Sequence, residues 1–307
     1  METLWQGSAN QWDCDEMGHM NVRIYVEKMM EGLGSFAHMI EMPHAFKPHS
    51  PSTLQPTDQH IRFIREVHPG RPLIMVGGVL EIGQSDVLLY QELRHGDGSA
   101  AASFRTRVQH ITSKTGLAFA WTERTRAALE TMRITPPEHT APRSIDPEAA
   151  ILDDQAATLA AAHNAGAPRI GLGHVPAHQC DAFGRMRTEW FMGRISDSVP
   201  NLLYDWRKQV AGAAGGKPMG AAVLEYRLVY RGWPKAGDRI EAYSSFARAE
   251  EKVHSIVHWL VDPDTGNAWL TSEAVAVTFD LETRKIIPTA PEQLAQLQAL
   301  APSGLGI

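Results

Sequence analysis

The sequence lacks the features that mark several classes of protein. It has 2 cysteines in 307 residues, too few for a disulfide framework, which indicates a reducing compartment. Its 29 lysines and arginines are outnumbered by 35 aspartates and glutamates, and the net charge of −6 argues against nucleic acid as a partner. No apolar run approaches the ~18 residues of a membrane span. The first residues also lack the basic segment followed by an apolar run that is typical of a targeting signal. We therefore expect a cytoplasmic protein with no membrane partner.

Familiar catalytic and metal-binding patterns are missing as well. No Gly-x-Ser-x-Gly elbow occurs, which excludes the serine enzymes of the α/β-hydrolase type. His174 and His178 are four residues apart, but Pro176 between them is incompatible with a helical pair of metal ligands. The sequence therefore predicts neither a metal site nor a cofactor. The other histidines that show no ligand spacing are His38, His44, His60, His68, His254 and His258.

One stretch, Trp12 to Asn21, precedes the clearest helix of the chain. Apolar residues after it, beginning with Val22 and Tyr25, are spaced by three and four, which predicts a helix with one buried face. Pro43 ends this pattern. Asn21 is the expected N-cap, because its side-chain oxygen can accept a hydrogen bond from a free N–H of the first turn.

The same loop brings three polar side chains to the N-terminus of that helix. They are a carboxylate (Asp15), an imidazole (His19) and an amide (Asn21). The free N–H groups and the helix dipole at this end favour developing negative charge. The loop is therefore the leading candidate for acid–base or nucleophilic chemistry.

A second copy of the loop occurs at Gln179 to Arg187. It repeats Cys-Asp-x-x-Gly-x-Met in register, so that Asp181 corresponds to Asp15 at an offset of 166 residues (181 minus 15). The only two cysteines of the chain, Cys14 and Cys180, occupy equivalent places, where packing is a commoner role than nucleophilic attack. Four residues in register indicate an internal duplication rather than chance.

The rest of the chain follows the same duplication. Each half has a strand, a loop, a long helix and then four strands with alternating apolar residues, which is an α+β arrangement with an antiparallel sheet. We expect domains at 1–132 and 170–307, packed as a pseudo-symmetric dimer, with a linker at 133–169 that contains a short helix at 153–165. The expected strands are 59–68, 73–82, 87–94 and 100–112, then 223–230, 239–247, 253–261 and 268–280, and residues 43–58 are expected to be irregular.

These residues resemble the hot-dog thioesterases, specifically the hydroxybenzoyl-CoA thioesterase branch. The sharpest match is Asp13 to Asn21 with Tyr25, close to that branch's Asp-x-x-Gly-His-x-Asn-x-x-x-Tyr pattern. Tyr230, Pro234, Gly237 and Asp238 add the strand and turn typical of such domains. The resemblance covers nearly the whole chain as two tandem hot-dog domains.

The resemblance implies an acyl-CoA thioesterase. The aspartate at the position of Asp15 would act as nucleophile or general base, and backbone N–H groups around Asn21 and Val22 would polarise the thioester carbonyl. His19 and Asn21 would position the reacting group, and a tunnel between the two halves would take the acyl chain. By the same resemblance, the substrate-binding residues would be Gly18, Val22, Tyr25, Gly184 and Arg185.

Several roles stay open at this stage. His19 can serve the chemistry or only a hydrogen bond within the loop, and Asn21 fits an N-cap better than a catalyst. Asp181 has Arg185 and Arg187 where the first loop has His19 and Asn21. It belongs either to a second active site of altered specificity or, as we favour, to a decayed site whose arginines bind a CoA phosphate or form ion pairs.

Two other functions compete with this interpretation. A hot-dog enoyl-CoA hydratase would have its Asp and His five residues apart with Asn and Pro between them, whereas Asp15 and His19 are four apart and lack the proline. A non-catalytic acyl-CoA or lipid-binding module would bind without turnover. The sequence leaves open the identity of the acyl group and whether the fused pair dimerises further.

Overall fold

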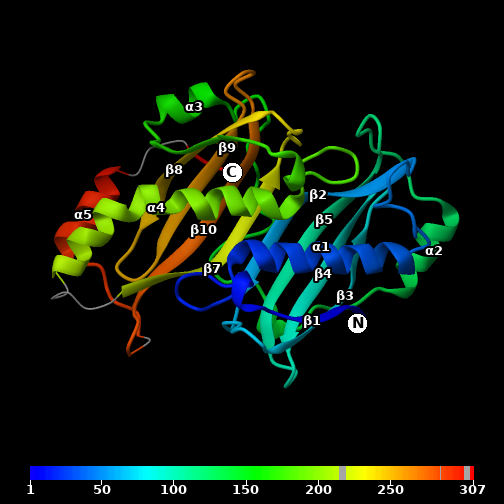
Figure 1. The fold of residues 1–307 in the computed structure, drawn as a ribbon, viewed down its shortest axis with the longest axis horizontal. Coiled ribbons are helices and arrows are strands. Elements are labelled where there is room, and N and C mark those ends of the chain that lie inside the picture. The colour runs from blue at the N-terminus through cyan, green and yellow to red at the C-terminus, as the bar shows by residue number, and fades with distance from the viewer. Residues whose placement is uncertain (214–218, 284, 301–304) are drawn as a thin grey trace. The chain divides into compact units, whose positions relative to one another are not determined.

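The computed structural model describes residues 1–213, 219–283, 285–300 and 305–307. The chain divides into two compact units (Figure 1). Unit 1 consists of residues 1–143 and 178–192, and unit 2 of residues 144–177 and 193–307. The second copy of the loop therefore belongs to the same unit as the first. Among the described residues, no helix is long and apolar enough to cross a membrane.

Unit 1 contains an antiparallel sheet and a long helix. The strands follow the order β1-β3-β4-β5-β2. Its elements are β1 (Glu2–Ser8), α1 (Val22–Met39), β2 (Ser52–Phe63), β3 (Pro72–Ile82), β4 (Asp86–His95), β5 (Ala100–Thr112) and α2 (Glu123–Thr131), with 3₁₀ turns at Gln11–Asp13 and Glu138–Thr140.

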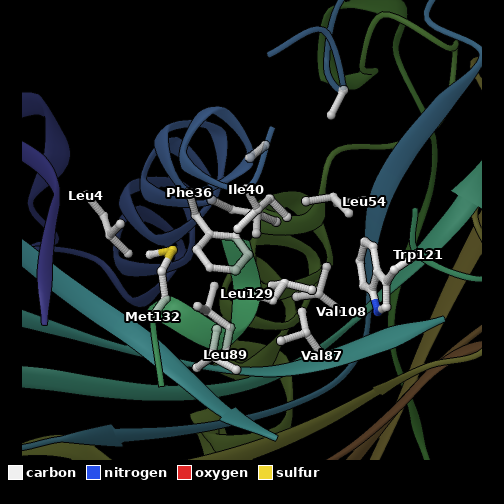
Figure 2. Close-up of a cluster of buried hydrophobic side chains, with 14 residues drawn as sticks. Leu4, Phe36, Ile40, Leu54, Val87, Leu89, Val108, Trp121, Leu129 and Met132 are labelled. Carbon is white, nitrogen blue, oxygen red and sulfur yellow. The ribbon is translucent and has the colours of Figure 1, made fainter. Parts of the chain in front are cut away.

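The core of unit 1 lies between α1 and the sheet (Figure 2). Leu33 and Phe36 lie on one face of α1, Ile40 follows as its C-cap, and all three are fully buried. They pack with Val87 and Leu89 of β4, among other strand residues. This packing fixes the helix across the strands and so determines where the loop at its N-terminus lies.

Unit 2 repeats the plan, with strand order β7-β10-β9-β8-β6. Buried Trp259 and Val261 of β9 pack with α3, while Val199 of α4 and Leu297 of α5 pack in a separate cluster. Its elements are α3 (Leu159–Asn164), β6 (Arg169–His174), α4 (Thr188–Ala213, which begins in unit 1), β7 (Met219–Tyr230), β8 (Arg239–Ala249), β9 (His254–Val261), β10 (Ala268–Asp280) and α5 (Pro291–Leu300). A 3₁₀ turn at Ala177–Gln179 precedes α4.

Strand β2 and helix α2 differ from the sequence-based expectation, and β7 begins at Met219, four residues before the expected strand. Strand β2 starts at Ser52 and ends at Phe63, instead of spanning 59–68, and residues 52–58 are not irregular. Its pairing with β5 shifts register between Pro56 and Asp58, a bulge that accommodates the proline inside a strand. Helix α2 was not predicted, although Thr122 caps it by accepting a hydrogen bond from the N–H of Thr125.

The helix expected at 153–165 is shorter. It covers Leu159–Asn164, and Thr158 is its N-cap, because the Thr158 side chain accepts a hydrogen bond from the N–H of Ala161. The Asp153 carboxylate, at the expected start of the helix, accepts instead from the N–H of Gln155 in a separate turn. The alanine-rich composition was thus a correct indication of a helix, but not of its start.

Candidate active site

The loop before α1 closes on itself through backbone hydrogen bonds. The N–H of Asp15 donates to the carbonyl of His19 at 2.8 Å, and the N–H of Gly18 donates to the carbonyl of Asp15 at 3.0 Å. Gly18 has a φ of 78°, a left-handed conformation that favours glycine. The turn therefore holds Asp15 and His19 in a defined arrangement.

The Asp15 carboxylate has one oxygen bound within the loop and one without a bound donor. Its Oδ1 accepts from the N–H of Met17 at 2.9 Å and of His19 at 3.3 Å. In the described part of the chain, no donor is bound to Oδ2. The half-buried carboxylate thus presents one oxygen whose lone pairs are available for reaction.

The N-terminus of α1 follows directly. Asn21 is the N-cap, as predicted, and its side-chain oxygen accepts from the N–H of Arg23 at 2.9 Å. The N–H of Ile24 donates to the carbonyl of Asn21. Within the described residues the N–H of Val22 has no acceptor, which leaves it as a donor at the positive end of the helix.

His19 contacts a second loop, which follows β2. Its Nε2 lies 3.2 Å from a carboxylate oxygen of Glu66, and its ring meets the ring of His68 edge-on with 5.0 Å between centroids. His68 Nδ1 is 3.2 Å from the carbonyl oxygen of Gly18, and the N–H of Met20 donates to the carbonyl of Val67 at 2.8 Å. The two loops are therefore joined by several contacts around His19.

Glu66 and His68 are site residues that the sequence did not reveal. His68 showed no ligand spacing along the chain, yet the ligand atoms of His19, Glu66 and His68 all lie within 4.8 Å of one another. Imidazole and carboxylate ligands at this spacing can hold a divalent cation such as Zn²⁺. The three side chains come together through the fold and not through spacing in one helix, so the sequence alone could not show this cluster, and the prediction of no metal site stays a prediction.

Tyr25 lies on the buried face of α1, beside this cluster. Burial raises the pKa of its phenol, and the nearby charges of Glu66 and Asp15 raise it further. Its ring packs edge-on against Phe63, with 5.1 Å between centroids. Tyr25 is thus a neutral phenol at physiological pH.

Asp181 forms the same turn in the second loop, but the partners of its second carboxylate oxygen, Oδ2, differ from those of Asp15. Its Oδ1 accepts from the N–H of Phe183 at 2.8 Å and of Arg185 at 3.0 Å, and Gly184 has a φ of 79°. Its Oδ2 accepts from Nε and Nη2 of Arg185 at 3.3 and 3.2 Å. The guanidinium thus occupies the oxygen that corresponds to the available one of Asp15.

The start of α4 adds a buried carboxylate to the second loop. Burial raises the pKa of Glu189, and Arg187, whose Nε lies 3.0 Å from its carboxylate, opposes this shift. Next to it, the ring of Trp190 lies 4.5 Å below the guanidinium of Arg23 from α1. No spacing in the sequence marks Glu189, because its burial depends on how α4 begins within unit 1.

A family match covers both loops. The family described as the thioesterase-like superfamily matches residues 9–132 and 175–297. The chain belongs to this superfamily. The chain is therefore a thioester hydrolase. Among curated proteins, none matches the sequence of this thioesterase-like chain.

Three solved structures share its fold over most of its length. A provisionally assigned oleoyl thioesterase from Lactobacillus plantarum is 11% identical, with a TM-score of 0.66 over 93% of this chain and 96% of that one. An acyl-ACP thioesterase from Bacteroides thetaiotaomicron is 12% identical (TM-score 0.63, 89% and 96% covered). The 12:0-ACP thioesterase from Umbellularia californica is 10% identical (TM-score 0.65, 89% and 92% covered). At these identities the likeness shows the fold alone, which is the predicted tandem of hot-dog domains.

Proposed function

We propose that this thioesterase-like chain hydrolyses acyl-CoA thioesters at Asp15. The observation that carries the proposal is the contrast between the two aspartates: no described residue donates to Oδ2 of Asp15, whereas Oδ2 of Asp181 is held by Arg185. The named activities of the three structural neighbours, on oleoyl or acyl-carrier-protein thioesters, support an acyl thioester as the substrate.

The chemistry needs a carboxylate and a donor for the oxyanion. Asp15 either attacks the thioester carbonyl carbon, forming a mixed anhydride that water then cleaves, or removes a proton from the water that attacks. In both routes the C–S bond breaks, the thiolate of CoA leaves and is protonated, and the acid is released. The N–H of Val22 would bind the oxyanion as it forms. A thioester has a good leaving group, so the scheme uses no metal.

His19 would act in the same scheme through its neighbours. The contact between its Nε2 and Glu66 fixes the orientation of the imidazole beside the loop that holds Asp15. His19 would therefore position the thioester or share the movement of the proton. Asn21 would contribute as the N-cap that fixes the first turn of α1.

The test is thiol release from a panel of short, long and aromatic acyl-CoAs. Because Asn keeps an oxygen at Oδ1 for the turn, Asp15→Asn should leave the fold intact and lower kcat about 10²- to 10³-fold. Asp181→Asn is the matched control, and we expect its kcat to fall less than about tenfold. Release of no thiol from any substrate by the unaltered protein, or full activity of Asp15→Asn, would refute the proposal.

Two further measurements define the reaction. A single turnover in ¹⁸O-water, followed by mass spectrometry of the protein, tests for the mixed anhydride route, because ¹⁸O in Asp15 can arise only by attack of water on the Asp15 carbonyl of the anhydride. Hydration of crotonyl-CoA without thiol release would assign the site to a hydratase instead.

A further inference from the structure

A pocket of about 350 Å³ opens in unit 1 next to the candidate active site. Its walls come from the loop at 65–72, between β2 and β3, and from the hairpin at 95–99, between β4 and β5. Two arginines, Arg65 and Arg71, and two histidines, His68 and His95, lie among its lining residues. The pocket is thus lined by four side chains that are cationic or can become so.

The two arginines of the pocket have no direct bonding partner among the described residues. Neither Arg65 nor Arg71 forms an ion pair or a side-chain hydrogen bond with any described residue, and both are exposed. Two carboxylates also line the pocket: Asp97 accepts from the hydroxyl and the N–H of Ser99, at 2.6 and 2.9 Å, and Glu66 contacts His19. The N–H groups of the Arg65 and Arg71 guanidiniums are therefore available to a ligand.

His95, on the other wall of the pocket, lies near both arginines. Burial lowers the pKa of its imidazole, Asp97 opposes this shift, and Arg65, His68 and Arg71 lower the pKa further. The two guanidiniums of the loop at 65–72 are thus near a ring that belongs to the other wall of the pocket. Guanidinium groups in such an arrangement suit a phosphate, which can accept several hydrogen bonds at once.

The pocket is continuous with the candidate active site. Glu66 and His68 line the pocket, and they also contact His19 and Gly18 of the catalytic loop. A ligand that extends from Asp15 along the two joined loops would therefore reach Arg65 and Arg71. The thioesters expected as substrates have a flexible pantetheine arm that ends in phosphate.

We infer that Arg65 and Arg71, with His68 and His95, bind a phosphate of the phosphopantetheine-containing group to which the acyl chain is attached. This inference rests on the proposed function and names the part of the substrate that the pocket recognises. The shared chemistry is a phosphate attached to pantetheine, present both in CoA and in the prosthetic arm of an acyl carrier protein.

The test compares Arg65→Gln/Arg71→Gln with the unaltered protein on two thioesters of the same acyl group. For acyl-CoA, we expect KM to rise about tenfold or more with kcat within a factor of two, because the substitutions remove ground-state contacts far from the reacting bond. For the acyl-N-acetylcysteamine thioester, which has no phosphate, we expect KM to stay the same. An unchanged KM for acyl-CoA, or an equal rise for both substrates, would overturn the inference.

The matched control is Arg124→Gln/Arg126→Gln in α2. It removes the same two charges from the same unit, at the opposite end of β3, where Arg126 contacts the carbonyl of Gly83. We expect this variant to have the KM of the unaltered protein for both substrates. A comparable rise in its KM for acyl-CoA would show a general effect of net charge and would also overturn the inference.

Two further experiments identify which phosphate the pocket binds and distinguish a failure of this inference from a failure of the proposed function. A KM effect that persists with acyl-dephospho-CoA and with an acyl carrier protein substrate assigns the pocket to the phosphate beside pantetheine, whereas an effect confined to acyl-CoA assigns it to the 3′-phosphate. If no substrate is hydrolysed, calorimetric binding of CoA decides: weaker binding by the Arg65/Arg71 variant alone supports the inference, and equal binding by both variants refutes it.

Discussion

Asp15 and Asp181 each stabilise the same kind of turn, but within the described residues only Asp181 has an arginine bound to its Oδ2. Each uses Oδ1 to accept two backbone N–H groups, so each aspartate is required for the shape of its loop. Arg185 then occupies Oδ2 of Asp181, at the position where the first loop has His19, whose side chain turns to Glu66 instead. Retention of an aspartate in both loops is therefore explained by the turn alone, and it does not require two active sites.

The contact between His19 and Glu66 leads to a prediction about coupling. His19 is 13% exposed and Glu66 40%, so the pair is only partly shielded from solvent and its interaction is modest. We expect Glu66→Gln to lower kcat/KM a few-fold, His19→Asn to lower it more, and the double variant to resemble His19→Asn. This result follows if Glu66 acts only by orienting His19.

Steady-state kinetics of the four proteins in this double-mutant cycle would check the prediction. Glu16→Gln is a suitable control, since Glu16 is exposed in the same loop and should not affect the rate. Losses that multiply, with the double variant far below His19→Asn, would show that Glu66 acts independently of His19.

For helices and strands, the sequence pattern predicted those features that depend on interactions between residues close together in the sequence. The start of α1 was predictable because the cap residue Asn21 and the buried face of the helix are contiguous in sequence. The first seven residues of β2 were not, because Pro56 suggests a loop and only the pairing with β5 shows a strand with a bulge. Helix α2 has few apolar residues, and its existence depends on packing Leu129 into the core of unit 1 (Figure 2).

The same distinction applies to the candidate site. Asp15, His19 and Asn21 were predictable because they occupy one loop. Glu66 and His68 were not, because a backbone hydrogen bond between Met20 and Val67 brings their loop to His19 only in the folded unit. Partners that come from distant parts of a chain leave no spacing in the sequence.

The segment after α2 is held by a buried arginine, which leads to a second prediction. Arg62 of β2 donates from Nη1 to the carbonyls of His139 and Ala141, at 2.8 and 2.7 Å. Each hydrogen bond from a charged donor contributes about 1.5–3 kcal/mol. We expect Arg62→Met to release this segment, so that trypsin cleaves after the exposed Arg143 about tenfold faster or more.

Limited proteolysis with mass spectrometry of the fragments would measure cleavage at Arg143. Arg124→Met removes an exposed arginine that pairs with Glu41, and it should leave this cleavage rate unchanged. Equal rates for Arg62→Met and the unaltered protein would mean that Arg62 does not hold the segment.

Across the whole chain, the duplication preserves backbone better than side-chain chemistry. Strands β5 and β10 both have 13 residues, and the hairpins before them turn at Gly98 and Gly266, with φ values of 84° and 80°. In unit 1 the buried Arg62 donates to the carbonyls of His139 and Ala141. In unit 2 the buried Arg227 donates in the same way to the carbonyls of Asp146 and Ala149. The charged groups beside the two aspartate loops differ, so the duplicated backbone carries a different arrangement of charges in each copy.

Unit 2 also contains a histidine whose burial makes the stability of the molecule depend on pH. His258 of β9 is 2% exposed, its Nδ1 lies 2.6 Å from the hydroxyl of Ser244, and its ring centroid lies 6.1 Å from that of Tyr226. Burial lowers the pKa of His258 to about 3, from an ordinary value of 6.5. Between these two values the unfolded chain binds a proton that the folded chain does not, so the free energy of unfolding falls as the pH falls.

We therefore expect His258→Gln to weaken the dependence of the free energy of unfolding on pH below pH 6.5. Glutamine can still bond to Ser244 but does not titrate, so the slope of the free energy of unfolding between pH 6.5 and about 4 should fall by up to ~1.4 kcal/mol per pH unit. Urea unfolding followed by circular dichroism at several pH values measures this slope. His174→Gln, at an exposed histidine of the same unit, should keep the slope of the unaltered protein. If His258→Gln kept it too, His258 would be protonated in the folded state, and the acid sensitivity would have to come from other buried groups such as His254, whose pKa burial also lowers.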